Sequence, residues 1–229
     1  MARRRLIAFA ALGIASYAVA MVATVPASAV FKNRPWRAGV AGTIWNGEVG
    51  IAGGTAVRWS WSPLRSLTSL GFAADWKATG PDTDLGGRVL AGFTSRVFDK
   101  VSGSATAAML PLLQPALPFT CDMTAQVEIE RAEFGGSGQM MKGTIVSDPG
   151  TCAPRGGGGA TQLPSLIMTS EKIGNETRIR VAPATQRLKT LINGVLHEDG
   201  QLEVSLTPEG AAMMPFIGLR PGITIRKQL

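Results

Sequence analysis

The sequence predicts a mainly β protein that begins with one transmembrane helix. An uncharged apolar run from Leu6 to Val25 follows three arginines, Arg3–Arg5, and as a helix it would be about 30 Å long, the hydrocarbon thickness of a bilayer. The rest of the chain is rich in Thr, Val and Ile runs, and the protein has 28 glycines and 14 prolines that interrupt them. Such short runs between turn residues are typical of β-strands.

We therefore expect a cytoplasmic segment at residues 1–5, a transmembrane helix at 6–25 and a β domain at 26–229. The alternative is a cleaved signal peptide, because Ala27-Ser28-Ala29 has the small-x-small form of a signal-peptidase site. The apolar run is longer than the 7–15 residues of an ordinary signal core, which favours a retained anchor. Charge barely fixes the orientation, since basic residues stand on both sides of the run.

The two cysteines, Cys121 and Cys152, are informative about the compartment. They are too few for a structural zinc site, and neither belongs to a C-x-x-C motif. In an exported domain such a pair predicts a disulfide, which requires an oxidising compartment, although two unrelated buried thiols are the alternative. Together with the apolar run, this favours an N-terminus inside and a domain on the other side of the membrane.

The first β elements can be placed from turn and alternation signals. Residues 40–51 predict a hairpin with its turn at Asn46-Gly47, since both residue types tolerate positive φ. Alternation in 56–61 and 70–76 places two trios each on one side of a strand: Val57, Trp59 and Trp61, and Phe72, Ala74 and Trp76. We expect the trios to form one continuous buried surface; an aromatic belt near the membrane and a ligand-stacking site are the alternatives.

Two later segments carry weaker signals. Residues 88–98 predict one strand. In 185–197, apolar residues recur at helical spacing, which predicts a short amphipathic helix packed on the sheet. These apolar residues are Leu188, Leu191, Ile192, Val195 and Leu196.

Catalytic and cofactor motifs are missing from the sequence. His197 is the single histidine, which excludes multi-histidine metal sites. The net charge of +7 is scattered rather than clustered, so it predicts no nucleic-acid partner. With no catalytic, cofactor or metal residues to assign, the sequence predicts a binding or structural protein and not an enzyme.

One family resemblance rests on the order of the first 80 residues. After the apolar run come Val40-Ala41-Gly42-Thr43-Ile44-Trp45-Asn46-Gly47 and then Trp59 with Pro63. This order resembles the type II secretion system protein N family, which typically has a V-x-G-T-hydrophobic-W-x-G hairpin after its membrane segment and a Trp-x-x-x-Pro element. The family motif residues are Gly42, Thr43, Trp45, Gly47, Trp59 and Pro63.

The resemblance implies an accessory, non-catalytic protein of the inner membrane, with a periplasmic β domain and other type II secretion components as partners. It also implies an elongated, curved antiparallel sheet similar to those of AsmA-like and lipopolysaccharide-bridge proteins. A second function follows from that likeness: a lipid-binding or lipid-transfer module that is anchored in the inner membrane. An open sheet with apolar faces would need a ligand or a partner to cover it.

Overall fold

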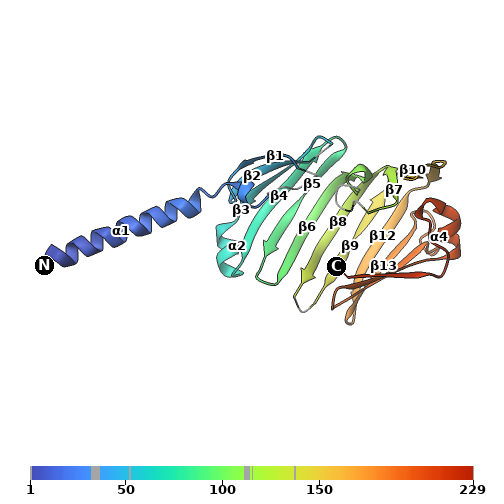
Figure 1. Ribbon diagram of the computed structural model, residues 1–229. Coiled ribbons are helices and arrows are strands. Elements are labelled where there is room, and N and C mark those ends of the chain that lie inside the picture. The colour runs from blue at the N-terminus through green and yellow to red at the C-terminus, as the bar shows by residue number, and fades with distance from the viewer. Residues whose placement is uncertain are drawn as a thin grey trace.

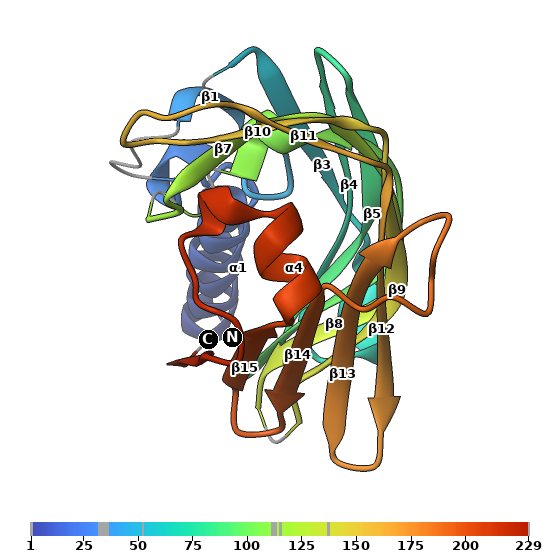
Figure 2. The ribbon, with the colours of Figure 1, turned by 90° about the vertical axis from the view of Figure 1, so that its right-hand side faces the viewer.

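One large, curved antiparallel sheet dominates the computed structural model (Figures 1 and 2). The structure describes residues 2–31, 37–51, 53–110, 114, 116–136 and 138–228, without the side chains of residues 2–6 and 8. Thirteen strands are hydrogen-bonded in the order β1-β2-β3-β4-β5-β6-β8-β9-β12-β13-β14-β15-β16, and a second sheet has the order β11-β10-β7. Neighbours in the large sheet follow one another along the chain, so the fold is a long meander. The mainly β, antiparallel fold that the sequence predicts is confirmed.

The strands of the large sheet are β1 (Arg37–Gly42), β2 (Asn46–Ile51), β3 (Thr55–Trp61), β4 (Phe72–Gly80), β5 (Thr83–Ala91), β6 (Ser95–Thr106), β8 (Thr124–Gly135), β9 (Met140–Ser147), β12 (Leu166–Ile173), β13 (Glu176–Pro183), β14 (Ile192–His197), β15 (Gln201–Leu206) and β16 (Thr224–Gln228). The small sheet consists of β7 (Phe119–Asp122), β10 (Gly150–Pro154) and β11 (Thr161–Leu163). Among the described residues the helices are α1 (Ala2–Ala23), α2 (Pro63–Thr68) and α4 (Pro208–Met213), with 3₁₀ turns η1 (Ala27–Ala29), η2 (Ala107–Met109) and η3 (Pro215–Ile217).

Helix α1 extends away from the β1 end of the sheet (Figure 1). Within the part of the chain that the structure describes, no helix has both the length and the apolar composition that crossing a membrane requires. The predicted span at 6–25 includes Leu6 and Ala8, whose side chains lie outside the described residues, and it stays a prediction.

The two faces of the large sheet differ in chemistry because the side chains alternate along every strand. One row of directly opposed residues crosses the sheet from β1 to β15 without a polar side chain: Val40, Val49, Val57, Ala78, Leu85, Gly103, Val127, Ile145, Met168, Val181, Ile192 and Leu206. Leu206 packs in a buried cluster with Met214 and Phe216, which follow α4 in the chain. Figure 2 shows α4 inside the curve of the sheet, so the apolar row lies on the concave face.

The convex face is charged. A row on the opposite side of the same strands contains Ser60, Asp75, Arg88, Asp99, Arg131 and Lys142. Neighbouring members form ion pairs, with Arg88 Nε 3.4 Å from Asp75 Oδ1 and Arg131 Nη1 3.3 Å from Asp99 Oδ1. Opposite charges on facing strands each add a little stability, and they keep this face in water.

The C-terminal end of the concave face is closed by a hydrophobic core. Its buried members are Cys152 and Leu163 of the small sheet, Leu191 and Leu206 at the large sheet, and Met214 and Phe216. Phe119 of β7 packs edge-on against Phe216, with ring centroids 5.2 Å apart. The core therefore joins three parts of the chain that are distant in sequence.

One strand prediction and one helix prediction are wrong. Residues 88–98 are not one strand, because β5 ends at Ala91 and the chain turns at Gly92, whose N–H donates to the Ser95 carbonyl at 2.9 Å. Residues 185–197 are not a helix. Their second half is strand β14, which pairs with β13 and β15 on its two sides, so sheet pairing prevails over a spacing that also fits a helix.

Candidate functional site

The predicted hairpin is confirmed, but its turn lies earlier than the Asn-Gly pair. Strands β1 and β2 pair from Arg37 to Gly42 and from Gly47 to Ile51, and the loop contains Thr43 to Trp45. Gly42 has a φ of +83° and so takes the left-handed conformation that the turn requires, whereas Gly47 lies within β2. The Thr43 N–H donates to the Asn46 carbonyl at 2.8 Å, and the Asn46 N–H donates to Thr43 Oγ1 at 3.2 Å. Thr43 therefore closes the turn from both its backbone and its side chain.

This hairpin loop holds the C-terminal end of α1. The Ile44 N–H donates to the Val25 carbonyl at 3.0 Å, and Trp45 Nε1 donates to the Val22 carbonyl at 2.8 Å. Pro26 forms an isolated β-bridge with Thr43. The Val22 carbonyl also accepts from the Val25 N–H at 3.4 Å, and Val25 lies just beyond the helix, so the two bonds from the loop hold the end of α1 against the hairpin. The family motif thus connects the helix to the sheet.

Gly47 and Trp59 fit together at the base of the hairpin. Trp59 Nε1 donates to the Ile44 carbonyl at 3.0 Å, which draws the indole ring over β2. A Cβ on Gly47 would lie 2.5 Å from Trp59 Cζ2 and 2.8 Å from the Ala41 carbonyl oxygen. Only glycine leaves room for this ring, so Gly47 is explained by close packing and not by a turn conformation.

The remaining motif residue, Pro63, lies one step further along the chain. It occupies the first turn of α2, where a proline costs no helical hydrogen bond. Just before it, Trp61 Nε1 donates to Ser66 Oγ at 2.8 Å, and the Trp61 ring packs against Trp45 with centroids 4.7 Å apart. All six motif residues therefore belong to one region, in which they fix the hairpin, α1 and α2 relative to β3.

An apolar groove opens on the concave face beside this junction. Its volume is about 450 Å³, and its lining residues are Val30, Phe31, Ile44, Trp59, Phe72, Ala74, Val89 and Ala91. No lining residue is ionisable. Phe31, just beyond η1, packs on Trp59 with ring centroids 5.4 Å apart. The wall of the groove is thus built partly from the segment that follows α1.

The two predicted aromatic trios share this face but do not form a fully buried surface. Trp59 opposes Trp76 and Trp61 opposes Ala74 across β3 and β4, as the alternation predicts. Ala74 is buried, whereas Trp59, Trp76 and Phe72 are half-buried and Trp61 is 37% exposed. Phe31, just beyond η1, packs on Trp59 at this end, whereas a core of six buried residues closes the C-terminal end. The prediction that the two trios lie on one face of the sheet is therefore confirmed, and the prediction that they form a buried surface is wrong.

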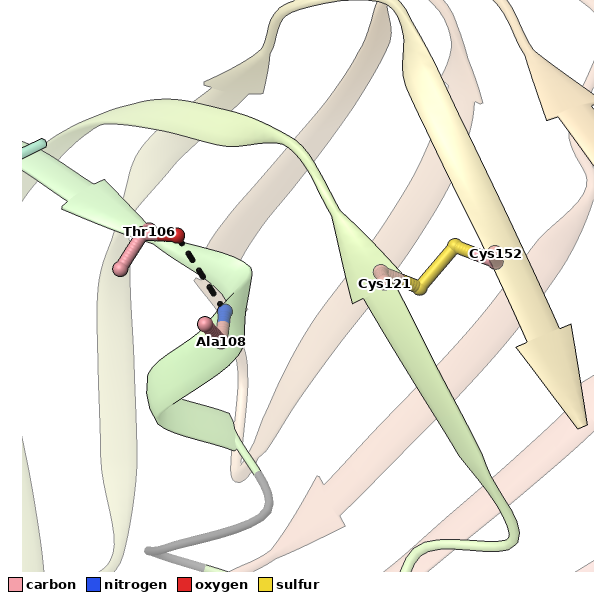
Figure 3. Close-up of a disulfide and its surroundings, with 4 residues drawn as sticks. All are labelled: Thr106, Ala108, Cys121 and Cys152. Carbon is pink, nitrogen blue, oxygen red and sulfur yellow. Dashed lines mark hydrogen bonds between the residues drawn. A yellow bond between two sulfur atoms is a disulfide. The ribbon is translucent and has the colours of Figure 1, made fainter. Parts of the chain in front are cut away.

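The cysteines lie at the other end of the molecule. Cys121 of β7 and Cys152 of β10 are directly opposite in the small sheet and form a disulfide (Figure 3), which confirms the predicted pairing. Figure 3 also shows the cap of η2, where Thr106 Oγ1 accepts from the Ala108 N–H at 3.3 Å. The disulfide borders the C-terminal core, because Cys152 is among the buried members of that core.

Ionisable groups give no sign of a catalytic arrangement in the described residues. No three His, Cys, Asp or Glu side chains there are grouped to hold a metal ion. On the convex face, the Glu48 carboxylate accepts a hydrogen bond from Arg58 Nε at 2.6 Å, and this bond raises the pKa of the exposed Arg58 guanidinium. That pair connects β2 to β3 on the side away from the groove.

Sequence reasoning missed Val30, Phe31, Val89 and Ala91 as parts of a site. The alternation within β5 is a signal for Val89 and Ala91, since both face the same side as Leu85. Nothing local indicates Val30 or Phe31, because they reach the groove only through the contact of the hairpin with the end of α1.

Comparison with known proteins tests the family resemblance. No curated protein and no solved structure matches the chain significantly. The family model described as "Type II secretion system (T2SS), protein N" matches residues 33–216, which include the motif hairpin, the disulfide and most of both sheets. The chain therefore belongs to the type II secretion system protein N family.

Proposed function

We propose that this protein is a non-catalytic accessory component of the type II secretion system, which acts in the export of folded proteins from the periplasm. The observation that carries the proposal is the family match over residues 33–216. In this proposal α1 anchors the protein in the inner membrane, and the curved sheet lies in the periplasm. Other secretion components are its partners.

The chemistry of α1 supports the anchor. Residues 6–25 contain no charge, and apolar side chains are exposed on every side of the helix. These exposed side chains are Ile7, Phe9, Leu12, Ile14, Val19, Met21 and Val22. A helix that lacks a polar face is stable only in an apolar environment. The uncharged part of α1, residues 6–23, would extend about 27 Å at 1.5 Å per residue, close to the hydrocarbon thickness of a bilayer.

The junction supports retention of the helix. Val22 and Val25 accept hydrogen bonds from the motif hairpin, and Ala27 of the small-x-small segment is fully buried. A leader that is removed would not contribute native contacts to the folded domain. The disulfide supports a periplasmic location, because such bonds persist in oxidising compartments.

Secretion itself tests the function. We expect deletion of the gene to leave folded secretion substrates in the periplasm and to lower their amount in the medium, and we expect the full chain to restore secretion. Gly39→Ala serves as a control for complementation, because a Cβ at Gly39 meets no atom within 4 Å. Unchanged secretion after deletion, together with no cross-link to any secretion component, would contradict the proposal.

Fractionation tests the anchor separately. We expect the full-length mass, beginning at Met1 or Ala2, in membranes after carbonate extraction, with Arg3–Arg5 accessible only from the cytoplasmic side. A mature protein that begins at Val30 in the soluble periplasmic fraction would show that the segment is a cleaved signal.

The apolar row on the concave face favours a second function, an anchored lipid-transfer module. Most members of the row are half-buried, and an apolar surface that is only partly covered commonly marks a binding site. This function predicts that deletion weakens the outer-membrane permeability barrier and leaves protein secretion intact. The secretion function predicts the opposite pattern, so the same deletion strain distinguishes the two.

A further inference from the structure

We propose that the groove beside the helix–sheet junction holds one acyl chain of a phospholipid from the membrane that anchors α1. This inference rests on the proposed anchoring of α1, and it adds a bound ligand to a secretion component. The headgroup stays at the membrane surface, and the acyl chain lies along the concave side of β3, β4 and β5.

The lining of the groove matches hydrocarbon. Its eight residues are Val, Phe, Ile, Trp or Ala, and its volume of about 450 Å³ lies within the range of small-ligand sites. A peptide in the same place would bring backbone N–H and C=O groups that need hydrogen-bond partners. Trp59 Nε1 bonds to the Ile44 carbonyl and Trp61 Nε1 bonds to Ser66, and the buried Trp76 Nε1, which has no partner among the described residues, does not line the groove. Hydrocarbon needs no such partners, so the lining favours an acyl chain.

The hairpin separates the groove from a second recess that lies against α1. On the helix side of the hairpin lies a second, mainly apolar recess of about 580 Å³, lined by Ala18, Val19, Val22, Ala23, Trp45, Asn46 and Trp61. Ile44 lines the groove, and its chain neighbour Trp45 lines the recess. A lipid beside the helix therefore meets apolar surface on both sides of the hairpin. Tryptophans such as Trp45 and Trp61 are also typical of the membrane interface.

The far end of the concave face is blocked. The small sheet, α4 and η3 bury Leu191 and Leu206 in the C-terminal core. A lipid that moved along the concave face from the groove toward β15 would be stopped by this core. The site therefore suits the holding of a lipid and not its passage along the protein.

Photolabelling of the full chain tests the proposal. The protein is placed in vesicles of phosphatidylethanolamine and phosphatidylglycerol that contain a phospholipid with a diazirine near the end of one acyl chain. We expect labelled peptides from the groove, in particular from β4 and β5, in addition to labels on α1. Label on α1 alone would overturn the proposal. A co-purified peptide that occupies the groove and excludes the lipid label would overturn it too.

Matched tryptophan variants sharpen the result. Val89→Trp fills the groove, whereas Arg88→Trp adds the same side chain to the convex face of the same strand at an exposed position. We expect Val89→Trp to lower the groove label about tenfold, as loss of a binding site requires, and Arg88→Trp to leave it unchanged. Ala91→Trp repeats the block if Val89→Trp fails to fold, which its melting curve reveals.

The two proposals fail in different ways. If α1 does not anchor the chain, the protein does not associate with the vesicles at all. If the protein associates and folds but Val89→Trp and Ala91→Trp keep the full groove label, the lipid site is wrong, and the secretion function is untouched.

Discussion

The helix-side end and the C-terminal end of the large sheet expose the same apolar face to different surroundings. At the C-terminal end, the small sheet, α4 and η3 cover β12, β14 and β15, and Leu191 is completely buried. At the helix side, β3, β4 and β5 present Trp59, Phe72 and Val89 to an open groove. The strand pattern is alike at both ends. What differs is whether a distant segment of the chain returns to cover the face, and this separates a structural core from a candidate binding surface.

The difference between the two ends predicts that truncating a side chain lowers the free energy of unfolding most in the C-terminal core. Phe216→Ala should lower the free energy of unfolding by about 3–5 kcal/mol, because it removes a buried ring and leaves a cavity beside Phe119. Phe93→Ala is the control, since Phe93 is 99% exposed in the β5–β6 loop and should change little. Urea unfolding of the full chain in detergent measures both. Equal effects would remove the distinction between closed and open ends.

Loss of the disulfide should have an effect of similar order at the same end. Replacing Cys121 and Cys152 by alanine opens a loop with a sequence separation of 31, for which the chain-entropy model gives about 3–4 kcal/mol. A reductant should lower the melting temperature of the natural chain and leave that of the double variant unchanged. If the double variant melts at the same temperature as the natural chain, the core holds the small sheet without the disulfide.

The open end should respond less to truncation. Trp59→Ala should cost about 2–3 kcal/mol, since the ring is only half-buried although its hydrogen bond to Ile44 is lost. Arg58→Ala, on the convex side of the same strand, should scarcely change the melting temperature, because it breaks only an exposed ion pair. Thermal melting compares the two. If Trp59→Ala keeps full stability but loses bound lipid or a partner, the tryptophan is a binding residue and not a structural one.

The smallest of these effects concerns the junction. Gly47→Ala should cost about 1–3 kcal/mol, because the added Cβ overlaps Trp59 and two backbone carbonyl oxygens. Gly39→Ala, in the paired strand of the same hairpin, has open space at its Cβ and should be neutral. Quenching of tryptophan fluorescence by brominated lipids should fall in the first variant only. Equal behaviour would show that the fit of Gly47 to Trp59 is not needed to hold the hairpin at α1.

Much of the fold could be predicted because its signals are local. Alternation in β3 and β4 placed Trp59 and Trp76 on one face, and the sheet confirms that placement. The pairing of Cys121 with Cys152 followed from there being only two cysteines. The resemblance to the family rested on motif spacing, and the family match confirms the family.

Other features depended on contacts between distant residues. Leu188 and Leu191 occupy one face of a hypothetical helix, but Leu188 is almost fully exposed and Leu191 is fully buried, because the chain there leads into strand β14 between β13 and β15. Likewise, Asn46-Gly47 has the residues of a hairpin turn, but Trp59 packs over Gly47 and the turn forms at Thr43 to Trp45. Local propensity yields to tertiary packing at both places.

By itself, the sequence determined which residues alternate, which cysteines could pair and where an uncharged apolar run precedes the β domain. Only the tertiary structure decided that the motif hairpin hydrogen-bonds to the end of α1, that Val30 and Phe31 complete a groove, and that α4 closes one end of the concave face and leaves the other open. The physical reason is that a β-strand fixes which side each residue faces, whereas covering that side depends on segments that return from far along the chain.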